Sequence, residues 1–349
     1  MKISELGEFG LIGRIAGILG PAPADVVVGI GDDVAVLHVG GSEHLLATCD
    51  IQVEGVHFRQ DATTPRQLGR KVAAINVSDI AAMGGTPRWA LVSLALPDDT
   101  AVAFVDELYK GLEEQLRWAG AAVVGGNCSR ASGEMMIDLC LLGSVQPDCM
   151  ILRKGARVGD SVLVTGTLGD SRAGLELILA PLGEVSEAAR RAVTERHLTP
   201  RPRLKEGQIL GASGMVHAMA DVSDGLMSDL GHICRAGNVG AEIWMERVPV
   251  SEACLEIAKG SGVDPLTWAL AGGEDYELLF TVDSRHVASV ADAVWRQTGI
   301  TCTEVGRILS PEEGIRAVHP DGRCLDFTAR AGGWDHFARG GNEKRGMKT

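Results

Sequence analysis

Apolar and polar residues recur along the chain with two different periods, and these predict strands and helices in both halves. Short apolar runs bounded by glycine or polar turns are typical of strands, whereas apolar spacings of three and four are typical of helices. The runs predict strands at residues 26–37 (with a turn at 31–33), 44–58, 89–96, 121–126, 135–145 and 161–166. The helical spacing covers residues 65–83, 100–119, 171–179, 185–196 and the segment after Leu226. The sequence therefore predicts a mixed α/β (α+β) fold.

A polar, loop-like stretch, residues 146–160, separates the two halves of this pattern. A chain of 349 residues most often forms two domains. We therefore expect an N-terminal domain over residues 1–149 and a C-terminal α/β domain over residues 150–338. The remaining residues 339–349 (RGGNEKRGMKT) lack an apolar anchor, which predicts a disordered tail.

The composition limits the kinds of partner. Lys and Arg number 33 and Asp and Glu number 46, so the formal net charge is −13. Binding to nucleic acid needs clustered Lys and Arg, so we expect no nucleic-acid partner. No run of 18 uncharged apolar residues is present, and charges interrupt the first apolar stretch, so we expect no membrane span and no secretory signal. The eight cysteines form no C-x-x-C pair, which indicates reduced thiols and a cytoplasmic protein.

Five aspartates stand beside glycine or where predicted strands end, each among apolar residues. They are Asp33, Asp50, Asp79, Asp221 and Asp224. One such aspartate alone is more often a helix cap or half of a buried ion pair. Five converging carboxylates would repel one another, and a hard cation resolves that repulsion. Oxygen ligands without a His or Cys cluster indicate Mg²⁺ or Mn²⁺, and Mg²⁺ held by carboxylates usually also bridges substrate phosphates.

Asp79 is the clearest of the five. The apolar stripe Leu68, Val72 and Ile75 of the predicted helix leads, four residues later, to Asp79. A carboxylate on the buried side of a helix is costly unless a cation or several donors meet it. The position therefore favours a metal ligand.

Other candidate positions have two interpretations each. Ser223 and Asp224 are good N-cap residues for the helix that begins near Leu226, and a helix N-terminus also attracts phosphate. The turn at 165–171 could cradle a phosphate, but it lacks the lysine of a Walker A loop and is more simply a strand-to-helix connection. Arg153 and the adjacent Lys154 could meet a nucleotide or could be ordinary surface charge.

Three further features complete the candidate chemistry. His57, taken alone, is more often structural than functional. The run at 271–280 predicts a turn at a ligand followed by a core strand. The sequence has no G-x-S-x-G elbow, no H-E-x-x-H motif and no strand-to-helix G-x-G-x-x-G, so serine hydrolase, zinc protease and dinucleotide-binding functions find little support.

Nine motifs together resemble the thiamine-monophosphate kinase family, which shares a superfamily with aminoimidazole ribonucleotide synthetase and selenophosphate synthetase. The motifs span nearly the whole chain in family order: ELGEFGLI (5–12), GIGDD (29–33), VEGVHF (53–58), NVSDIAAMGG (76–85), RKGARVGD (153–160), VTGTLGDS (164–171), DVSDGLMSDLGHI (221–233), GGEDYELLF (272–280) and GWDHF (333–337). The first, the third and the run GGEDYELL distinguish this family from its relatives.

The resemblance implies ATP-dependent phosphorylation of thiamine monophosphate to thiamine diphosphate by direct in-line transfer, with several Mg²⁺ ions and no general base. It implies a two-domain aminoimidazole ribonucleotide synthetase-like architecture. The N-terminal domain would bind ATP and Mg²⁺, and its strands would pair in a homodimer.

The resemblance also implies roles for individual residues. Metal ligands would be Asp33, Thr48, Asp50, Asp79, Asn127, Asp221 and Asp224. ATP contacts would be Gly126, Asn127, Arg153 and Ser223. The thiamine phosphate site would be lined by His57, Glu274 and Trp334. No residue is expected to act as a catalytic acid or base.

Two departures from the family pattern leave an alternative open. The family usually has GGDT where this chain has Gly125-Gly126-Asn127-Cys128, and a hydroxyl residue where this chain has Cys49. The alternative is therefore a weak or inactive protein that binds nucleotide or thiamine phosphate. Another ATP-dependent member of the superfamily fits less well. The first cysteine is too late for selenophosphate synthetase, and the chain lacks the terminal cysteine of the hydrogenase-maturation relative.

Overall fold

The computed structural model describes residues 3–19, 21–180 and 182–327. Its strands are β1 (Val26–Val28), β2 (Ala35–Leu37), β3 (His44–Val53), β4 (Thr86–Leu96), β5 (Ala122–Arg130), β6 (Met136–Val145), β7 (Asp160–Thr165), β8 (Val216–Asp221), β9 (Gly240–Trp244), β10 (Leu278–Asp283), β11 (Cys302–Leu309), β12 (Ile315–Val318) and β13 (Cys324–Asp326). Its α-helices are α1 (Ile3–Leu6), α2 (Glu8–Leu19), α3 (Pro65–Ala82), α4 (Val102–Trp118), α5 (Asp170–Leu179), α6 (Glu187–Leu198), α7 (Leu204–Ser213), α8 (Leu226–Gly237), α9 (Glu252–Ser261), α10 (Pro265–Ala271) and α11 (Val287–Thr298).

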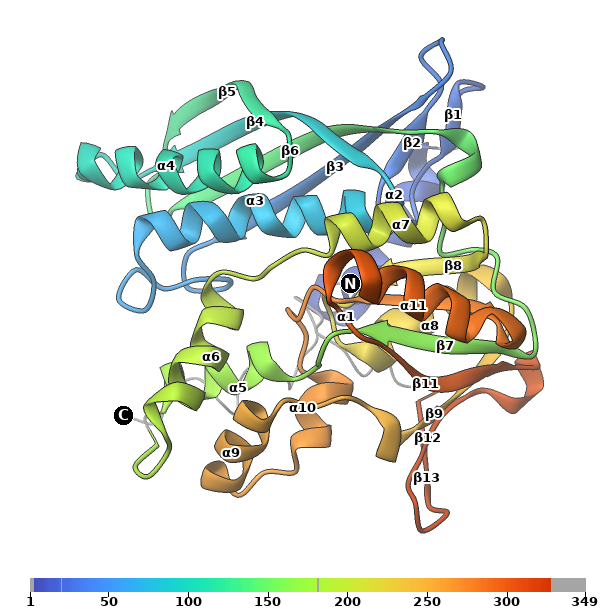
Figure 1. Ribbon diagram of the computed structural model, residues 1–349. Helices are drawn as coiled ribbons and strands as arrows, with labels where there is room; N and C mark the ends of the chain where they lie inside the picture. The colour runs from blue at the N-terminus through green and yellow to red at the C-terminus, as the bar shows by residue number, and fades with distance from the viewer. Residues whose placement is uncertain (1–2, 20, 181, 328–349) are drawn as a thin grey trace.

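Two mixed sheets organise the chain (Figure 1). The first has the order β1-β2-β3-β6-β4-β5, and only its β4–β5 pair is parallel. The second has the order β13-β12-β9-β11-β7-β10-β8, and only its β9–β12 pair is parallel. The mixed α/β fold predicted from the sequence is confirmed.

Helix α3 has strong start signals in the sequence. The Thr64 side chain accepts a hydrogen bond from the Gln67 backbone N–H, the Gln67 side chain accepts one from the Thr64 N–H, and Pro65 occupies the first turn. Its apolar residues Leu68 and Val72 are fully buried in the core beneath the first sheet. The predicted helix over 65–83 is therefore confirmed within a residue.

Helix α4 packs against α3 at very short range because each helix has a glycine at the crossing. A Cβ on Gly69 would collide with the Leu108 carbonyl oxygen, and a Cβ on Gly111 would collide with the Arg66 carbonyl oxygen. Only glycine permits backbones to approach this closely. In Figure 1 the two helices lie side by side along one face of the first sheet.

The other face of the first sheet carries no helix among the described residues (Figure 1). Large apolar side chains on it are exposed, including Trp89 (49%), Leu91 (41%) and Val124 (59%). We refer below to this surface as the open face.

Helix α3 lies between the first sheet and the second half of the chain. Its far side contacts β8 and α7, and a Cβ on Gly207 of α7 would collide with the Ala81 carbonyl oxygen. This contact places the carboxyl end of β8 close to the end of α3. The two segments that bring most of the candidate aspartates together are therefore neighbours.

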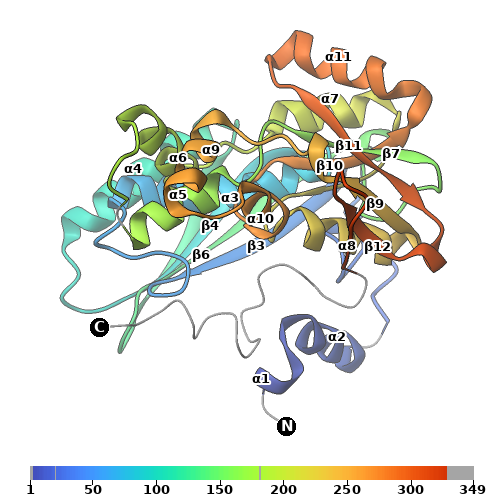
Figure 2. The same cartoon turned by 90° about the horizontal axis from the view of Figure 1, so that it is seen from below.

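The connection between the two sheets, residues 146–159, includes the predicted domain boundary at 149/150, which stays a prediction. Figure 2 shows α1 and α2 outside both sheets, and Phe9 of α2 contacts His232 of α8 with ring centroids 4.9 Å apart. None of the described helices is both long and apolar enough to cross a bilayer. The cytoplasmic location also stays a prediction, and the tail at 339–349 lies outside the described residues.

Candidate active site

Three predicted metal ligands meet at the junction of the two halves. Asp33 follows β1, Asp79 lies near the end of α3, and Asp221 ends β8. One carboxylate oxygen from each lies within 4.8 Å of the other two. We call these three residues the aspartate cluster.

Asp79 links the cluster to strand β3. Thr48 Oγ1 donates a hydrogen bond to Asp79 Oδ2 (2.5 Å), and the Asp79 carboxyl is hydrogen-bonded to Asp50. Burial raises the pKa of Asp79 well above its usual value, and the charges of Asp50 and Asp221 raise it further. Without a cation, these carboxyls therefore share protons.

Asp50 and Asp221 show the same effect. Burial raises the pKa of Asp50 to about 6, although its hydrogen bond with Asp79 opposes the rise. Burial, followed by the charge of Asp33, raises the pKa of Asp221 to about 7, against the hydrogen bond that Ser78 Oγ donates to Asp221 Oδ2 (2.6 Å). A divalent cation would relieve this repulsion, since all the ligands are oxygens.

The Asp33 carboxylate shows that the cluster has unused ligand capacity. Its side chain is only 1% exposed, and Arg153 Nη2 donates to Asp33 Oδ1 at 2.5 Å. Its other oxygen, Oδ2, is buried without a hydrogen-bond partner. Such an oxygen is costly unless something meets it, so these residues fit a hard cation.

Arg153 is thus fixed at the cluster by its ion pair with Asp33, and its contact with ATP stays a prediction. Asp32, the neighbour of Asp33 in the same motif and not a predicted site residue, accepts hydrogen bonds from the Arg153 backbone N–H (3.2 and 3.3 Å). Burial, then the charge of Asp33, raises the pKa of Asp32 to about 6. Asp32 therefore ties the connection between the two halves to the aspartate cluster.

Asp224 lies in a second, adjacent group rather than in the aspartate cluster. It is joined there by Asp229 and His232, with one ligand atom of each within 4.8 Å of the others. Burial, then Arg153 and Arg235, lowers the pKa of His232 to about 3, so its imidazole is neutral at pH 7.

The predicted N-cap at Ser223 or Asp224 is wrong. The cap of α8 is Gly225, and the Asp229 carboxylate accepts hydrogen bonds from the Asp224 and Gly225 N–H groups, both at 3.1 Å. Asp229, from inside the helix, thus accepts from the N–H groups of the cap residue and of the residue before it, whereas the Ser228 and Asp229 N–H groups donate to the Gly225 carbonyl oxygen. Its own pKa is raised well above the usual value by burial and by Asp224.

Glu274 lies on the loop that faces the end of β8. Its backbone N–H donates to the Ser223 carbonyl oxygen (2.7 Å), which places Ser223 beside it. Lys71 Nζ lies 2.8 Å from Glu274 Oε1 and His197 Nδ1 lies 3.4 Å from Oε2. His57 is also close enough to act on the Glu274 charge. His57 Nδ1 accepts a hydrogen bond from the Val53 N–H (3.0 Å), and a shared substrate site for His57 and Glu274 stays a prediction.

The core strand predicted after the 271–280 turn is confirmed, since β10 is buried except at Asp283, and the predicted turn at a ligand stays a prediction. Asp275 accepts hydrogen bonds from the Gly169 N–H (2.7 Å) and the Ser171 N–H (3.1 Å), so it caps the start of α5. The turn at 165–171 is therefore the predicted strand-to-helix connection, held by a carboxylate.

Gly126 and Asn127 do not join the aspartate cluster within one chain. Asn127 pairs with Ser93, which pairs with Asp138, and Cys49 Sγ donates to Asp138 Oδ1 (3.2 Å). Successive side chains on a strand alternate between faces, so Asn127 shares the open face with Cys49, whereas Asp50 faces α3. Its strand is also three strands from β3, a lateral distance of about 14 Å.

Gly126 has a structural role on the same strand. A Cβ at this position would collide with the Val92 carbonyl oxygen of β4. The close approach of β4 and β5 therefore requires glycine there. Trp334, the last predicted substrate residue, lies outside the described residues.

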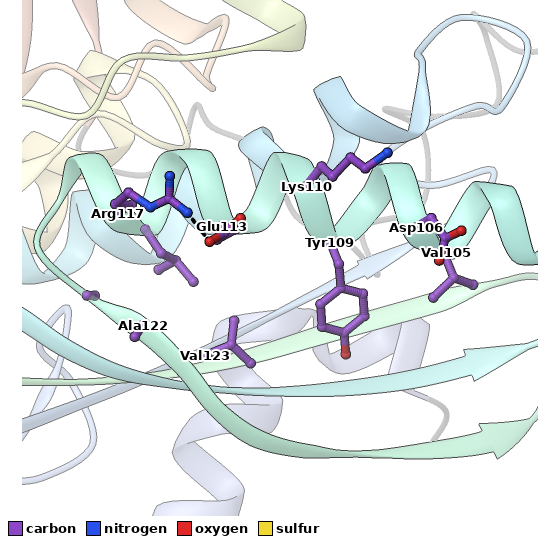
Figure 3. A pocket seen from close by; sticks show the side chains of 10 residues that line it. Val105, Asp106, Tyr109, Lys110, Glu113, Arg117, Ala122 and Val123 are labelled. Carbon is purple, nitrogen blue, oxygen red and sulfur yellow. Dashed lines mark hydrogen bonds and ion pairs between the residues drawn. The ribbon is translucent and has the colours of Figure 1, made fainter.

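A groove of about 610 Å³ lies elsewhere, between α4 and β5 (Figure 3). Tyr109 and Val123 face each other across it, and Arg117 pairs with Glu113 along its rim. None of its lining residues belongs to the predicted site. It has no cluster of acids, so the groove does not share the chemistry described above.

Comparison with known proteins identifies the family. The AIR synthase related protein models match residues 31–145 (N-terminal domain) and 157–318 (C-terminal domain). Thiamine-monophosphate kinase of Aquifex aeolicus is 39% identical over 337 residues, which cover 97% of this chain and 100% of that protein. The Escherichia coli K12 enzyme of the same name is 36% identical over 332 residues, with coverage of 95% and 98%.

Solved structures agree. The structure of AaThiL complexed with AMPPCP and TMP has a TM-score of 0.83 and 38% identity, and the match covers 96% of this chain and 99% of that one. Thiamine-monophosphate kinase from Stenotrophomonas maltophilia has a TM-score of 0.73 and 33% identity, with coverage of 92% and 98%. The chain belongs to the thiamine-monophosphate kinase family.

Proposed function

We propose that this protein transfers the γ-phosphoryl group of ATP to thiamine monophosphate, giving thiamine diphosphate and ADP. The observation that carries the proposal is the aspartate cluster, in which three carboxylates from distant segments converge. Full-length similarity to kinases of this name supports it, as does the similarity to a structure holding an ATP analogue and TMP.

The acceptor group explains why the site needs no general base. The second pKa of a phosphomonoester is about 6, so the attacking phosphate oxygen of thiamine monophosphate is already anionic at neutral pH. The obstacle is the repulsion between two polyanions. Mg²⁺ would neutralise that charge and align donor and acceptor.

The metal would be held by the aspartate cluster together with Asp50 and Thr48, with Asp224 at a neighbouring position. The orphaned Asp33 Oδ2 and the raised pKa values of Asp50 and Asp221 support this assignment. Mn²⁺ is the alternative ion.

The two substrates would bind on either side of this metal centre. Arg153, fixed by Asp33, would meet the ATP phosphates, and Ser223 would lie beside them. Glu274 and His57 would line the thiamine monophosphate site, together with Trp334.

We also propose a homodimer that covers the open face of the first sheet. The exposed Trp89, Leu91 and Val124 support it, since large apolar patches usually mark interaction surfaces. In one chain, Asn127 faces away from the aspartates. Gly126 and Asn127 would therefore take part in ATP or metal binding only across such an interface.

Turnover tests the proposed function directly. Purified protein is incubated with ATP, Mg²⁺ and thiamine monophosphate, and thiamine diphosphate is resolved by chromatography. We expect product from the monophosphate, none from thiamine, and none when EDTA removes the metal.

The same assay separates the alternative function. If ATP and thiamine monophosphate bind, as measured by calorimetry, but no product forms, the protein is a binder of these ligands and not a kinase.

A further inference from the structure

Besides Asp79, two further side chains of helix α3 make polar contacts with the described part of the second half of the chain. Ser78 Oγ donates to Asp221 in the aspartate cluster, and Lys71 Nζ lies 2.8 Å from Glu274 Oε1. The two residues are seven positions apart, so they share one face of the helix and lie about 10.5 Å apart along its axis. One rigid helix therefore sets the distance between the aspartate cluster and Glu274.

Lys71 is too deeply buried to touch a substrate. Its side chain is 4% exposed, whereas that of Glu274 is 30% exposed. The ammonium group thus lies on the inner side of the carboxylate. The Glu274 carboxylate keeps an outer side that is open to solvent.

The second partner of Glu274 carries little charge. Burial lowers the pKa of His197 to about 4, and its Nδ1 also lies 3.0 Å from Ser171 Oγ. His57 and Tyr276 also interact electrostatically with the carboxylate. The Lys71 side chain, 2.8 Å away, is therefore the main partner of Glu274 in the interior.

The backbone here is held in an uncommon conformation. Glu274 has φ +59° and Tyr276 has φ +51°, in the left-handed region that disfavours side chains. Their N–H groups donate to the carbonyl oxygens of Ser223 and Val222. Such conformations persist where the surroundings over-determine them, and the Lys71–Glu274 pair is one such constraint.

We propose that Lys71 is a positioning residue for the substrate: it holds the Glu274 carboxylate at a fixed distance from the aspartate cluster, where the carboxylate meets a cationic ring. The inference rests on the proposed function. Thiamine monophosphate has a positively charged thiazolium joined to its phosphate by two methylenes, so one end suits a metal-held phosphate and the other an anion. A phosphate ester with an uncharged ring gains no binding energy from the Glu274 carboxylate. The Lys71–Glu274 pair therefore favours substrates whose ring is positively charged.

The test measures how Lys71→Met affects each substrate separately. We expect the KM for thiamine monophosphate to rise about tenfold, equivalent to about 1.4 kcal/mol, because Glu274 is no longer held. The KM for ATP and kcat should stay within about twofold, since uniform substrate binding is what is lost. Lys71→Arg, which keeps the charge, should recover most of the affinity.

A double-mutant cycle shows whether Lys71 acts through Glu274. Glu274→Gln alone should raise the same KM, and adding Lys71→Met should cause little further change. A phosphate monoester with an uncharged ring of the same shape should show no difference between wild type and either variant. Lys110→Met removes an exposed lysine paired with Glu107 and should change nothing.

Three results would overturn the inference. The first is that Lys71→Met impairs both KM values and kcat equally, in step with a lower thermal stability. The second is that the effects of Lys71→Met and Glu274→Gln on KM are fully additive. The third is that Lys71→Met affects the uncharged analogue as much as thiamine monophosphate. If the wild type forms no product, the proposed function fails separately. The same cycle is then scored on the calorimetric Kd for thiamine monophosphate.

Discussion

Single carboxylates in this protein owe their properties to where the chain buries them. Asp79 and Asp221 lie beside Asp33 in the aspartate cluster. The main positive charge there is Arg153, which pairs with Asp33. Deprotonating a carboxyl in such a place costs free energy. A bound divalent cation would offset this cost because it stabilises the carboxylates. The metal-free protein should therefore be sensitive to pH in the range where these groups lose protons.

The pH dependence of stability tests this at Asp221. Its pKa is raised from 3.8 to about 7, so between these values the folded state binds a proton that the unfolded state has released. Stability without metal therefore falls as pH rises through this window. In EDTA from pH 5 to 8, the melting temperature of the wild type should fall by several degrees relative to that of Asp221→Asn. Added Mg²⁺ should remove the difference, and parallel curves in EDTA would contradict the assignment.

Which residues could be foreseen depended on the pattern around them. Asp79 was predicted because it continues the stripe of Leu68, Val72 and Ile75, and the structure places it in the cluster. The same signal was available for two residues that were missed. Asp229 falls on the stripe of α8 and Lys71 on that of α3, each at a position where an apolar residue would be expected.

Elements, in turn, are positioned by close backbone contacts. The α3–α4 crossing depends on Gly69 and Gly111, because any side chain there would strike a carbonyl oxygen of the other helix. Since α3 carries Lys71, Ser78 and Asp79, a shift of this helix would disturb both ends of the site.

Gly111→Ala tests the crossing. Overpacking typically costs about 1–3 kcal/mol, and we expect a loss of that size in urea unfolding together with reduced turnover. Gly13→Ala, in α2, is the matched control, since nothing lies within 4 Å of a Cβ there. Equal effects of the two substitutions would show that the crossing is not tight.

The least predictable elements are those stabilised by tertiary contacts. No helix was predicted at α7, whose Gly207 and Gly211 weaken the helical pattern but pack closely on Ala81 and Cys149. Strand β5 was predicted to end at residue 126 and extends to Arg130, because the polar residues 127–130 continue the parallel pairing with β4. The local sequence pattern reveals neither the close packing of α7 nor the pairing of β5 with β4.

At the scale of the whole molecule, sequence pattern gave two mixed α/β halves but not their mutual placement. The hydrogen bond between Ser78 and Asp221 joins positions 143 apart, and no local period signals it. The orientation of Asn127 is also a property of the whole sheet. Its motif suggested a place beside the aspartates, whereas the strand register puts it on the open face.

The proposed homodimer is tested on that face. Trp89→Glu should shift the protein from dimer to monomer in light scattering after size-exclusion chromatography, because a charge would be buried in an apolar contact. Trp295→Glu is the control, since Trp295 of α11 is also exposed (58%, against 49% for Trp89) but lies in the second half of the chain. A monomeric wild type, or equal behaviour of both variants, would contradict this interface.

The burial of α3 also governs how the protein comes apart. Its sides are covered by the first sheet and α4 from the first half of the chain and by α7 and β8 from the second half, so both halves hold this helix at once. Its amide hydrogens should therefore exchange with solvent only through global unfolding, as in the slowest cooperative units of other proteins. Fraying of the outer helices α1 and α2 would leave the aspartate cluster assembled.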